Sequence, residues 1–157
     1  MTTINEKRSA ARRIALQAIY QAEVQGDSFI VQMLPEFINQ ATADNDIRQL
    51  ATLMACGAWD YRNDADQWAG RLMPHWTVSR LAAVDRNILR LALWELARQS
   101  QTPGKVTLDE AINMAREYST AESSAFINGV MDAAFKQHTL LTNTAKREFQ
   151  ESTDGKL

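Results

Sequence analysis

The 157-residue sequence predicts an all-α protein, a single compact domain of about six to seven helices. Prolines and glycines are scarce, with three prolines and six glycines in the chain. Between them run long segments rich in Ala, Leu, Glu, Arg and Gln, which favour helix. No Asn-Gly or Asp-Gly turn joins two alternating strands, so nothing indicates a β-hairpin.

The first half of the chain predicts three helices. Thr3 is followed three residues later by a glutamate, the spacing of a capping box, so the first helix begins there and ends at Gly26. A second, weaker helix spans about 28–40. A third begins near residue 44, and its apolar pattern allows one helix over 44–72 before Pro74 ends it.

The second half predicts a connector, a central helix and two further helices. Residues 75–82 form the connector, and 83–99 is apolar around so much of its circumference that it belongs at the centre of a bundle. Capping-box spacings start the next two helices at Thr107 and Ser119. Residues 139–157 are polar and are expected to form a flexible tail.

Charge and cysteine content narrow the class of protein. The net charge is −2, which argues against tight nucleic-acid binding by this chain alone but leaves room for a local basic patch or a shared interface. One cysteine excludes an intrachain disulfide. No secretory signal or transmembrane run is visible, so we expect a cytoplasmic protein without membrane contact.

Catalytic chemistry finds no support in the sequence. His75 and His138 are the two histidines, and neither stands at metal-ligand spacing from a cysteine or a carboxylate pair. Cys56 falls in an apolar helical segment and is interpreted as a structural thiol. Glycine-rich phosphate loops and nucleophile elbows are absent from the sequence. We therefore predict no enzyme activity, no metal and no cofactor.

The first helix carries the clearest candidate binding surface. Lys7, Arg8, Arg12 and Arg13 lie in its first half, and Tyr20 follows Arg13 by about two turns, or ~10.5 Å. Bases of single-stranded RNA stack on such a ring while guanidinium groups contact phosphates. On composition alone, an ordinary solvated basic face with a half-buried tyrosine fits better, because basic helix faces are common.

A second candidate lies at the start of the last helix, in the segment 122–130 (ESSAFINGV). Ser123 falls in the first turn, where free N–H groups suit an anion. Phe126, taken alone, reads as a core residue. Gly129 costs about 1 kcal/mol in a helix interior, so we expect it to admit another backbone closely.

Four ordered stretches resemble one known family, the NusB family of bacterial transcription antitermination factors. They are 12–20 (RRIALQAIY), 85–96 (DRNILRLALWEL), 105–115 (KVTLDEAINMA) and 126–132 (FINGVMD). Their order and spacing match the family from about residue 8 to 136. The resemblance implies one NusB-like domain over 1–138, with packed helical subdomains at about 3–73 and 77–138.

The resemblance also implies a function. Members bind the boxA segment of ribosomal RNA operon leaders together with NusE, a small-subunit ribosomal protein, and help RNA polymerase read through terminators. The RNA contacts carried over to matching positions here are Arg8, Arg12, Tyr20, Ser123 and Phe126.

The remaining site assignments rest on position or on one matching residue. Lys7 and Arg13 join the RNA contacts because of their place in this sequence. Asp85 matches an acid that contacts NusE in the family, and Trp76 is assigned to the partner from its exposed connector. Ala125 stands where members often carry a lysine, so one phosphate contact is expected to be missing.

Three alternatives stay open at this point. In the first, the chain binds RNA in ribosomal RNA maturation instead of antitermination. In the second, it forms a homodimer that covers the RNA face. A purely protein-binding module would use tryptophans as anchors, since tryptophan is enriched at interface hot spots. The four candidates for such anchors are Trp59, Trp68, Trp76 and Trp94.

Overall fold

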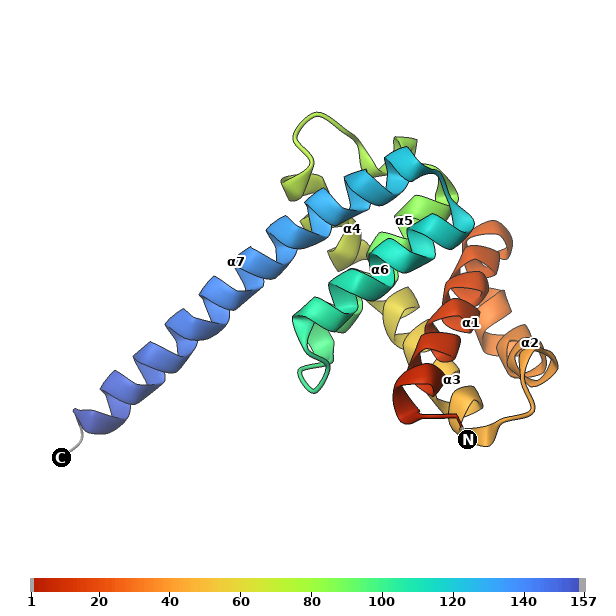
Figure 1. Ribbon diagram of the computed structural model, residues 1–157, viewed down its shortest axis with the longest axis horizontal. Helices are drawn as coiled ribbons and strands as arrows, with labels where there is room; N and C mark the ends of the chain where they lie inside the picture. Colours follow the sequence, from red (N-terminus) through yellow and green to blue (C-terminus); the bar gives the residue numbers. More distant parts are fainter. Residues whose placement is uncertain (1, 156–157) are drawn as a thin grey trace.

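The computed structural model describes residues 2–155 and contains only helices and connecting loops over that range (Figure 1). The elements in chain order are α1 (Ile4–Gln25), a π-helical segment η1 (Phe29–Met33), α2 (Leu34–Ala41), α3 (Asn45–Asp60), α4 (Arg62–Leu72), a 3-10 turn η2 (Val78–Arg80), α5 (Ala83–Arg98), α6 (Gly104–Tyr118) and α7 (Ala121–Asp154). The all-α prediction is confirmed.

Helix α5 is the centre of the bundle, as its apolar composition predicts. It packs against α1, α3, α4, α6 and α7, and ten of its residues are buried. On one side α1 packs against α2 and α3, and on the other α6 packs against α7. One cluster of buried side chains joins both groups, so the expected division into two subdomains remains a prediction.

Small residues set the close packing of α1 on α3. Ala11, Ala15, Ala18 and Ala22 are all fully buried on α1, at the helical spacing that the sequence shows. On α3, Gly57 lies under the ring of Trp94 from α5, and a Cβ there would stand 2.3 Å from Cζ2 of that ring. Glycine is therefore required where the indole crosses α3.

Two of the predicted helices are interrupted. The segment expected as one helix over 44–72 divides at Tyr61, which ends α3 and precedes α4. The weak helix expected over 28–40 divides into η1 and α2, with Pro35 in the first turn of α2. Pro35 fits that place because a first-turn residue needs no N–H donor.

Of the three predicted capping boxes, one is confirmed and two are wrong. Thr3 and Glu6 form the capping box, with hydrogen bonds of 3.2 and 2.8 Å. Helix α6 begins at Gly104, three residues before Thr107, which is buried inside the helix. Helix α7 is capped by Thr120, whose Oγ1 accepts a hydrogen bond from the Ser123 N–H, so Ser119 is not the cap.

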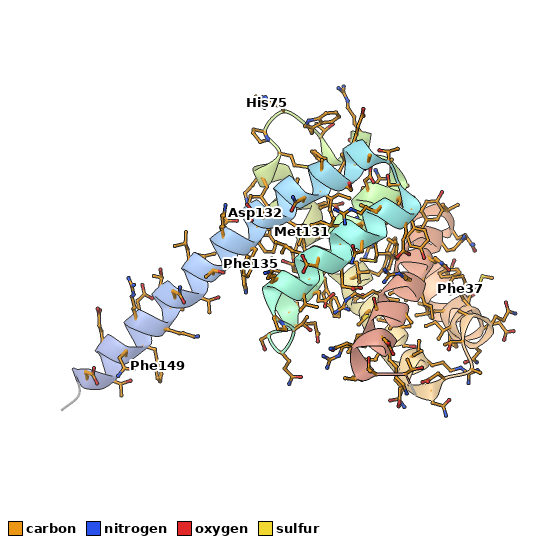
Figure 2. All side chains as sticks on the ribbon, viewed as in Figure 1. Phe37, His75, Met131, Asp132, Phe135 and Phe149 are labelled. Atoms are coloured by element: carbon orange, nitrogen blue, oxygen red, sulfur yellow. The ribbon has the colours of Figure 1, made fainter. Side chains whose placement is uncertain are left out.

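In place of the expected flexible tail, α7 continues as one 34-residue helix to Asp154. Its second half projects from the bundle, and the exposed Phe149 marks this projecting part (Figures 1 and 2). Helix-favouring residues lie mainly within 145–151 (AKREFQE) of this segment. The last two residues of the predicted tail lie outside the described residues. Gly129 faces open space, so the expected close backbone approach is absent there.

Candidate nucleic-acid interface

Arg12, a predicted RNA contact, is buried. Its side chain is enclosed between α1 and α5, with 2% of the residue exposed. Nε donates to Oε2 of Glu95 at 2.9 Å, and a second nitrogen approaches Glu110 at 3.7 Å. The prediction that Arg8, Arg12 and Tyr20 form one accessible surface is therefore wrong. Arg12 neutralises a buried glutamate instead.

Two other cations of α1 are partly exposed but already paired. Lys7 Nζ lies 2.7 Å from Oδ2 of Asp46 and 3.2 Å from Oδ2 of Asp44. These hydrogen bonds raise the pKa of Lys7, that from Asp46 most. Backbone hydrogen bonding from Ile47, followed by the Lys7 contact, lowers the pKa of Asp44. An RNA phosphate at Lys7 has to compete with both acids.

Arg13 is held by acids of α6. Its Nε and Nη2 donate to the two carboxylate oxygens of Glu117, and Nη1 lies 3.2 Å from Oε2 of Glu110. The hydrogen bond with Glu117 raises the pKa of Arg13 and lowers that of Glu117. Arg8 is half-buried and forms no ion pair within residues 2–155.

The helix geometry of α1 decides which cation shares a face with Tyr20. At 3.6 residues per turn, Arg13 and Tyr20 differ by only about 20° around the axis. Arg8 and Tyr20 differ by about 120°. An RNA strand with a base stacked on Tyr20 therefore reaches Arg13 along the same face of α1, whereas Arg8 lies to one side.

Tyr20 lines a shallow cavity of about 270 Å³ where α1, α2, α5 and α6 meet. The ring is 37% exposed, and Tyr118, at the end of α6, is 40% exposed in the same cavity. Sequence reasoning missed Tyr118, which follows Glu117, the partner of Arg13. Its only signal in the sequence was an aromatic at the polar end of a predicted helix.

A second cavity, of about 230 Å³, brings four predicted site residues together. Trp76, Asp85, Ser123 and Phe126 all line it, although the sequence analysis divided them between RNA and the protein partner. The rings of Trp76 and Phe126 pack with centroids 5.8 Å apart and an angle of 58°. Arg80, which sequence reasoning missed, completes the rim and is exposed.

Hydrogen bonds fix the polar side of this second cavity. Thr120 Oγ1 donates to Ser123 Oγ at 3.0 Å, and Ser123 Oγ donates to Oδ2 of Asp85 at 2.8 Å. The Ser123 hydroxyl proton is thus directed at Asp85, so Ser123 holds the carboxylate rather than offering that proton to a phosphate. Asp85 itself is buried, with 7% of the residue exposed.

Both cavities border the first turn of α5. Val84 lines the cavity of Tyr20, and the next residue, Asp85, lines that of Trp76 and Phe126. The connector that carries Trp76 stands beside the first turns of α7, as the position of His75 shows in Figure 2. We name the surface formed by both cavities the aromatic face.

The tryptophans, possible metal ligands and possible membrane helices give no further candidate site within the described residues. Of the four tryptophans, three are buried and only Trp76 is exposed, so a module anchored by all four is not supported. Over the described range, no group of three or more His, Cys, Asp or Glu side chains is arranged to hold a metal ion. None of the helices described has the length and apolar character needed to cross a membrane.

Comparison with known proteins gives consistent matches. Residues 9–136 match the NusB family. The transcription antitermination protein NusB of Bifidobacterium animalis subsp. lactis is 37% identical over 126 residues, which cover 80% of this chain and 81% of that protein. The T. maritima NusB structure is 31% identical, covers 88% of this chain and 94% of that one, and superposes with a TM-score of 0.74.

A further solved structure, described as antitermination factors NusB and NusE in complex with dsRNA, is 24% identical, with a TM-score of 0.73. It covers 83% of this chain and 97% of that one, and at this identity it supports the fold alone. The family match spans most of this chain, and the match to the Bifidobacterium protein covers most of both proteins. The chain therefore belongs to the NusB family.

Proposed function

We propose that this protein is a transcription antitermination factor that binds boxA-type single-stranded RNA of ribosomal RNA operon leaders. It acts in the cytoplasm as an adaptor without turnover, together with NusE, and promotes read-through by RNA polymerase. The observation that carries the proposal is the aromatic face, two cavities with exposed or half-exposed rings that both border the first turn of α5, one at Val84 and the other at Asp85.

Ring chemistry favours single-stranded RNA as the ligand of this face. Bases of an unpaired strand stack on aromatic side chains, and each stacked base contributes about 1–3 kcal/mol. Tyr20 and Tyr118 offer rings in one cavity, and Trp76 and Phe126 offer rings in the other. Arg80 lines one cavity, and Arg13 lies about two turns from Tyr20 on the same face of α1, so each cavity has a cation within reach of an RNA phosphate.

Charge explains why a partner is needed. The net charge is −2, and both Lys7 and Arg13 are already neutralised by carboxylates. If Arg13 and Arg80 each contact one phosphate, the log–log dependence of single-strand affinity on salt has a slope of only about −1.4. Affinity of the protein alone is then modest, and NusE adds contact area to the same RNA.

The experiment measures the affinity of a boxA-type RNA for the protein with and without NusE. We expect NusE to strengthen RNA binding, and equal affinity in both cases would contradict the adaptor role. Arg13→Glu should weaken binding, whereas Arg71→Glu, on an exposed arginine of α4, should leave it unchanged. Loss of binding in both variants would point to overall charge instead of the aromatic face.

Two of the alternatives are tested in the same preparation. Recovery of polymerase factors with the tagged protein supports antitermination, whereas recovery of ribosome-assembly intermediates supports a role in ribosomal RNA maturation. Light scattering of the free protein, with and without RNA, measures whether a homodimer forms and whether RNA dissociates it.

A further inference from the structure

Arg86, in the first turn of α5, hydrogen-bonds the backbone of the connector 75–82. Its Nη1 donates to the carbonyl oxygen of Leu81 at 2.8 Å and to that of Val78 at 3.3 Å. Within residues 2–155, no other side chain forms a hydrogen bond with the connector backbone. Val78 and Leu81 are also the two connector residues that are partly buried, while the rest of the connector is exposed. The connector is therefore held to the bundle at these two residues.

The same guanidinium group pairs with a glutamate of α1. Its Nε donates to Oε1 of Glu23 at 2.6 Å, and Nη2 pairs with the same oxygen. Oε2 of Glu23 accepts a hydrogen bond from Nδ2 of Asn87 at 2.7 Å, so α5 fixes both carboxylate oxygens. Glu23 follows Tyr20 by three residues, and side chains at this spacing are neighbours on a helix surface. Arg86 thus joins the helix that carries Tyr20 to the connector.

Arginine suits this double contact. Its planar guanidinium presents five N–H donors in a fixed fork, so one group can bind a carboxylate and two carbonyl oxygens together. The Arg86 side chain is only 15% exposed, and partly buried charge pairs are screened less by salt than exposed ones. Arg86 lines neither cavity of the aromatic face, so its contacts are made with the protein alone.

The connector carries two residues that line the second cavity. Arg80 lies between the two residues whose carbonyl groups Arg86 binds, and Trp76 lies a few residues earlier, against Phe126. Both Arg80 and Trp76 are exposed. An RNA strand that binds a mobile connector has to order it, and that ordering weakens binding. A connector held in advance avoids this cost.

We propose that Arg86 is a positioning residue of the RNA-binding surface, which fixes Trp76 and Arg80 relative to Tyr20 without touching the RNA. A strand that contacts both cavities then meets them at a fixed separation. The inference rests on the proposed RNA-binding function and adds to it a residue that lies outside both cavities.

The first experiment needs no RNA and measures hydrogen exchange in the connector by mass spectrometry. The amides of Arg80 and Leu81 donate to carbonyl groups within the connector. In Arg86→Met they should exchange about tenfold faster than in the native protein, as expected when a hydrogen bond from a charged group is lost.

The matched control is Arg90→Met, one turn further along α5. Arg90 pairs with Asp66 at 2.7 Å and approaches Glu23 at 3.6 Å, but it does not contact the connector. The control therefore removes the same charge from the same helix and also disturbs Glu23. Exchange in the connector of Arg90→Met should equal that of the native protein.

The second experiment measures the affinity of a boxA-type RNA with NusE present. Arg86→Met should weaken binding about tenfold, because RNA then has to order the connector side chains. In a variant that already carries Trp76→Ala and Arg80→Ala, adding Arg86→Met should cause no further loss, since the side chains that Arg86 positions are gone. Arg90→Met should bind RNA as the native protein does.

A conservative variant covers the case in which Arg86→Met does not fold. Arg86→Lys keeps a charge beside Glu23 but has one nitrogen in place of three, so it cannot hold the acid and both carbonyl groups in the same way. It should loosen the connector and weaken RNA binding in the same direction as Arg86→Met, by a smaller factor.

Three results would overturn the inference. The first is native exchange in the connector of Arg86→Met, and the second is an equal loss of RNA affinity with and without Trp76 and Arg80. The third is an Arg86 variant that binds RNA normally but loses NusE, because the connector would then serve the protein partner. The native protein binds RNA in all three cases, so the proposed function survives. If the native protein does not bind RNA, that function fails, while hydrogen exchange still decides whether Arg86 holds the connector.

Discussion

The carboxylate of Glu117, on α6, accepts hydrogen bonds from Nε and Nη2 of Arg13, on α1, at 2.9 and 2.6 Å. This contact occupies the cation that shares a helix face with Tyr20. Glu117 is exposed, so an RNA phosphate can replace it at Arg13 without burying a charge. The strength of RNA binding should therefore depend on an acid that does not touch the RNA.

Glu117→Gln is expected to raise RNA affinity. Because an exposed ion pair is weak, removing the competing charge should strengthen binding by about two- to fivefold at low salt. Titration of labelled RNA measures the change. The control is Asp109→Asn, on an exposed acid of the same helix, which also removes one negative charge but lies away from Arg13. An equal gain in both variants would show that net charge alone is responsible.

Arg12 is expected to matter for stability. It forms a buried pair with Glu95, and removing one partner leaves an uncompensated buried charge, at a cost of about 3–5 kcal/mol. Arg12→Met should lower the free energy of unfolding in urea by that amount. The double variant Arg12→Met with Glu95→Leu should recover most of it, because no lone charge remains. A single variant as stable as the native protein would contradict this role.

Two glycines give a matched pair for packing. Gly57→Ala should destabilise the fold by about 1–3 kcal/mol, because its Cβ would meet the buried Trp94 ring at 2.3 Å. Gly70→Ala, at an exposed position of α4 with open space around the Cβ, should stabilise the helix by up to about 1 kcal/mol. Thermal unfolding measures whether the melting temperature falls in the first variant and rises in the second, relative to the native protein. Equal melting temperatures would contradict the assigned contact.

Acid should destabilise the protein through Asp44. Its pKa is lowered in the folded chain, first by the Ile47 N–H and then by Lys7. A carboxyl of this kind stabilises the fold above its unfolded pKa of about 4, and the contribution is lost as the pH falls through the lower folded value. Asp44→Ala should therefore lose less stability than the native protein between about pH 6 and pH 3.

Urea titrations at several pH values test this prediction. Asp64→Ala is the control, since Asp64 is exposed in the first turn of α4 and accepts no side-chain hydrogen bond within residues 2–155. Its stability should fall with acid as steeply as that of the native protein. If stability fell equally with acid in all three proteins, Asp44 would not be a source of the acid destabilisation.

Local sequence patterns predicted the helices well and the interactions between them poorly. The central position of α5 followed from its apolar circumference, and the Thr3 cap from its spacing. The break at Tyr61 has no proline or glycine to signal it, and the structure shows there only a change of direction into α4, which packs on α5 and α7. The projecting half of α7 was missed because a polar composition does not distinguish an exposed helix from a flexible tail.

Long-range partners explain the errors in the candidate site. Arg12 looks like any cation of a basic helix, and only the fold brings Glu95, 83 residues away, against it. Asp85 and Ser123 were assigned to different ligands, and the fold joins them across 38 residues. Tyr20 was found from its place on the basic first helix and Phe126 from the family resemblance, whereas Tyr118 and Arg80 become candidates only once the cavities are seen.

The path of RNA across the aromatic face is tested most directly by ultraviolet crosslinking of a boxA-type RNA to the protein with NusE, followed by mass spectrometry of the crosslinked peptides. The account predicts crosslinks at Tyr20 and Tyr118 in one cavity and at Trp76 and Phe126 in the other. Crosslinks confined to the apolar groove between α2 and α3, around Ile38 and Leu53, would contradict it.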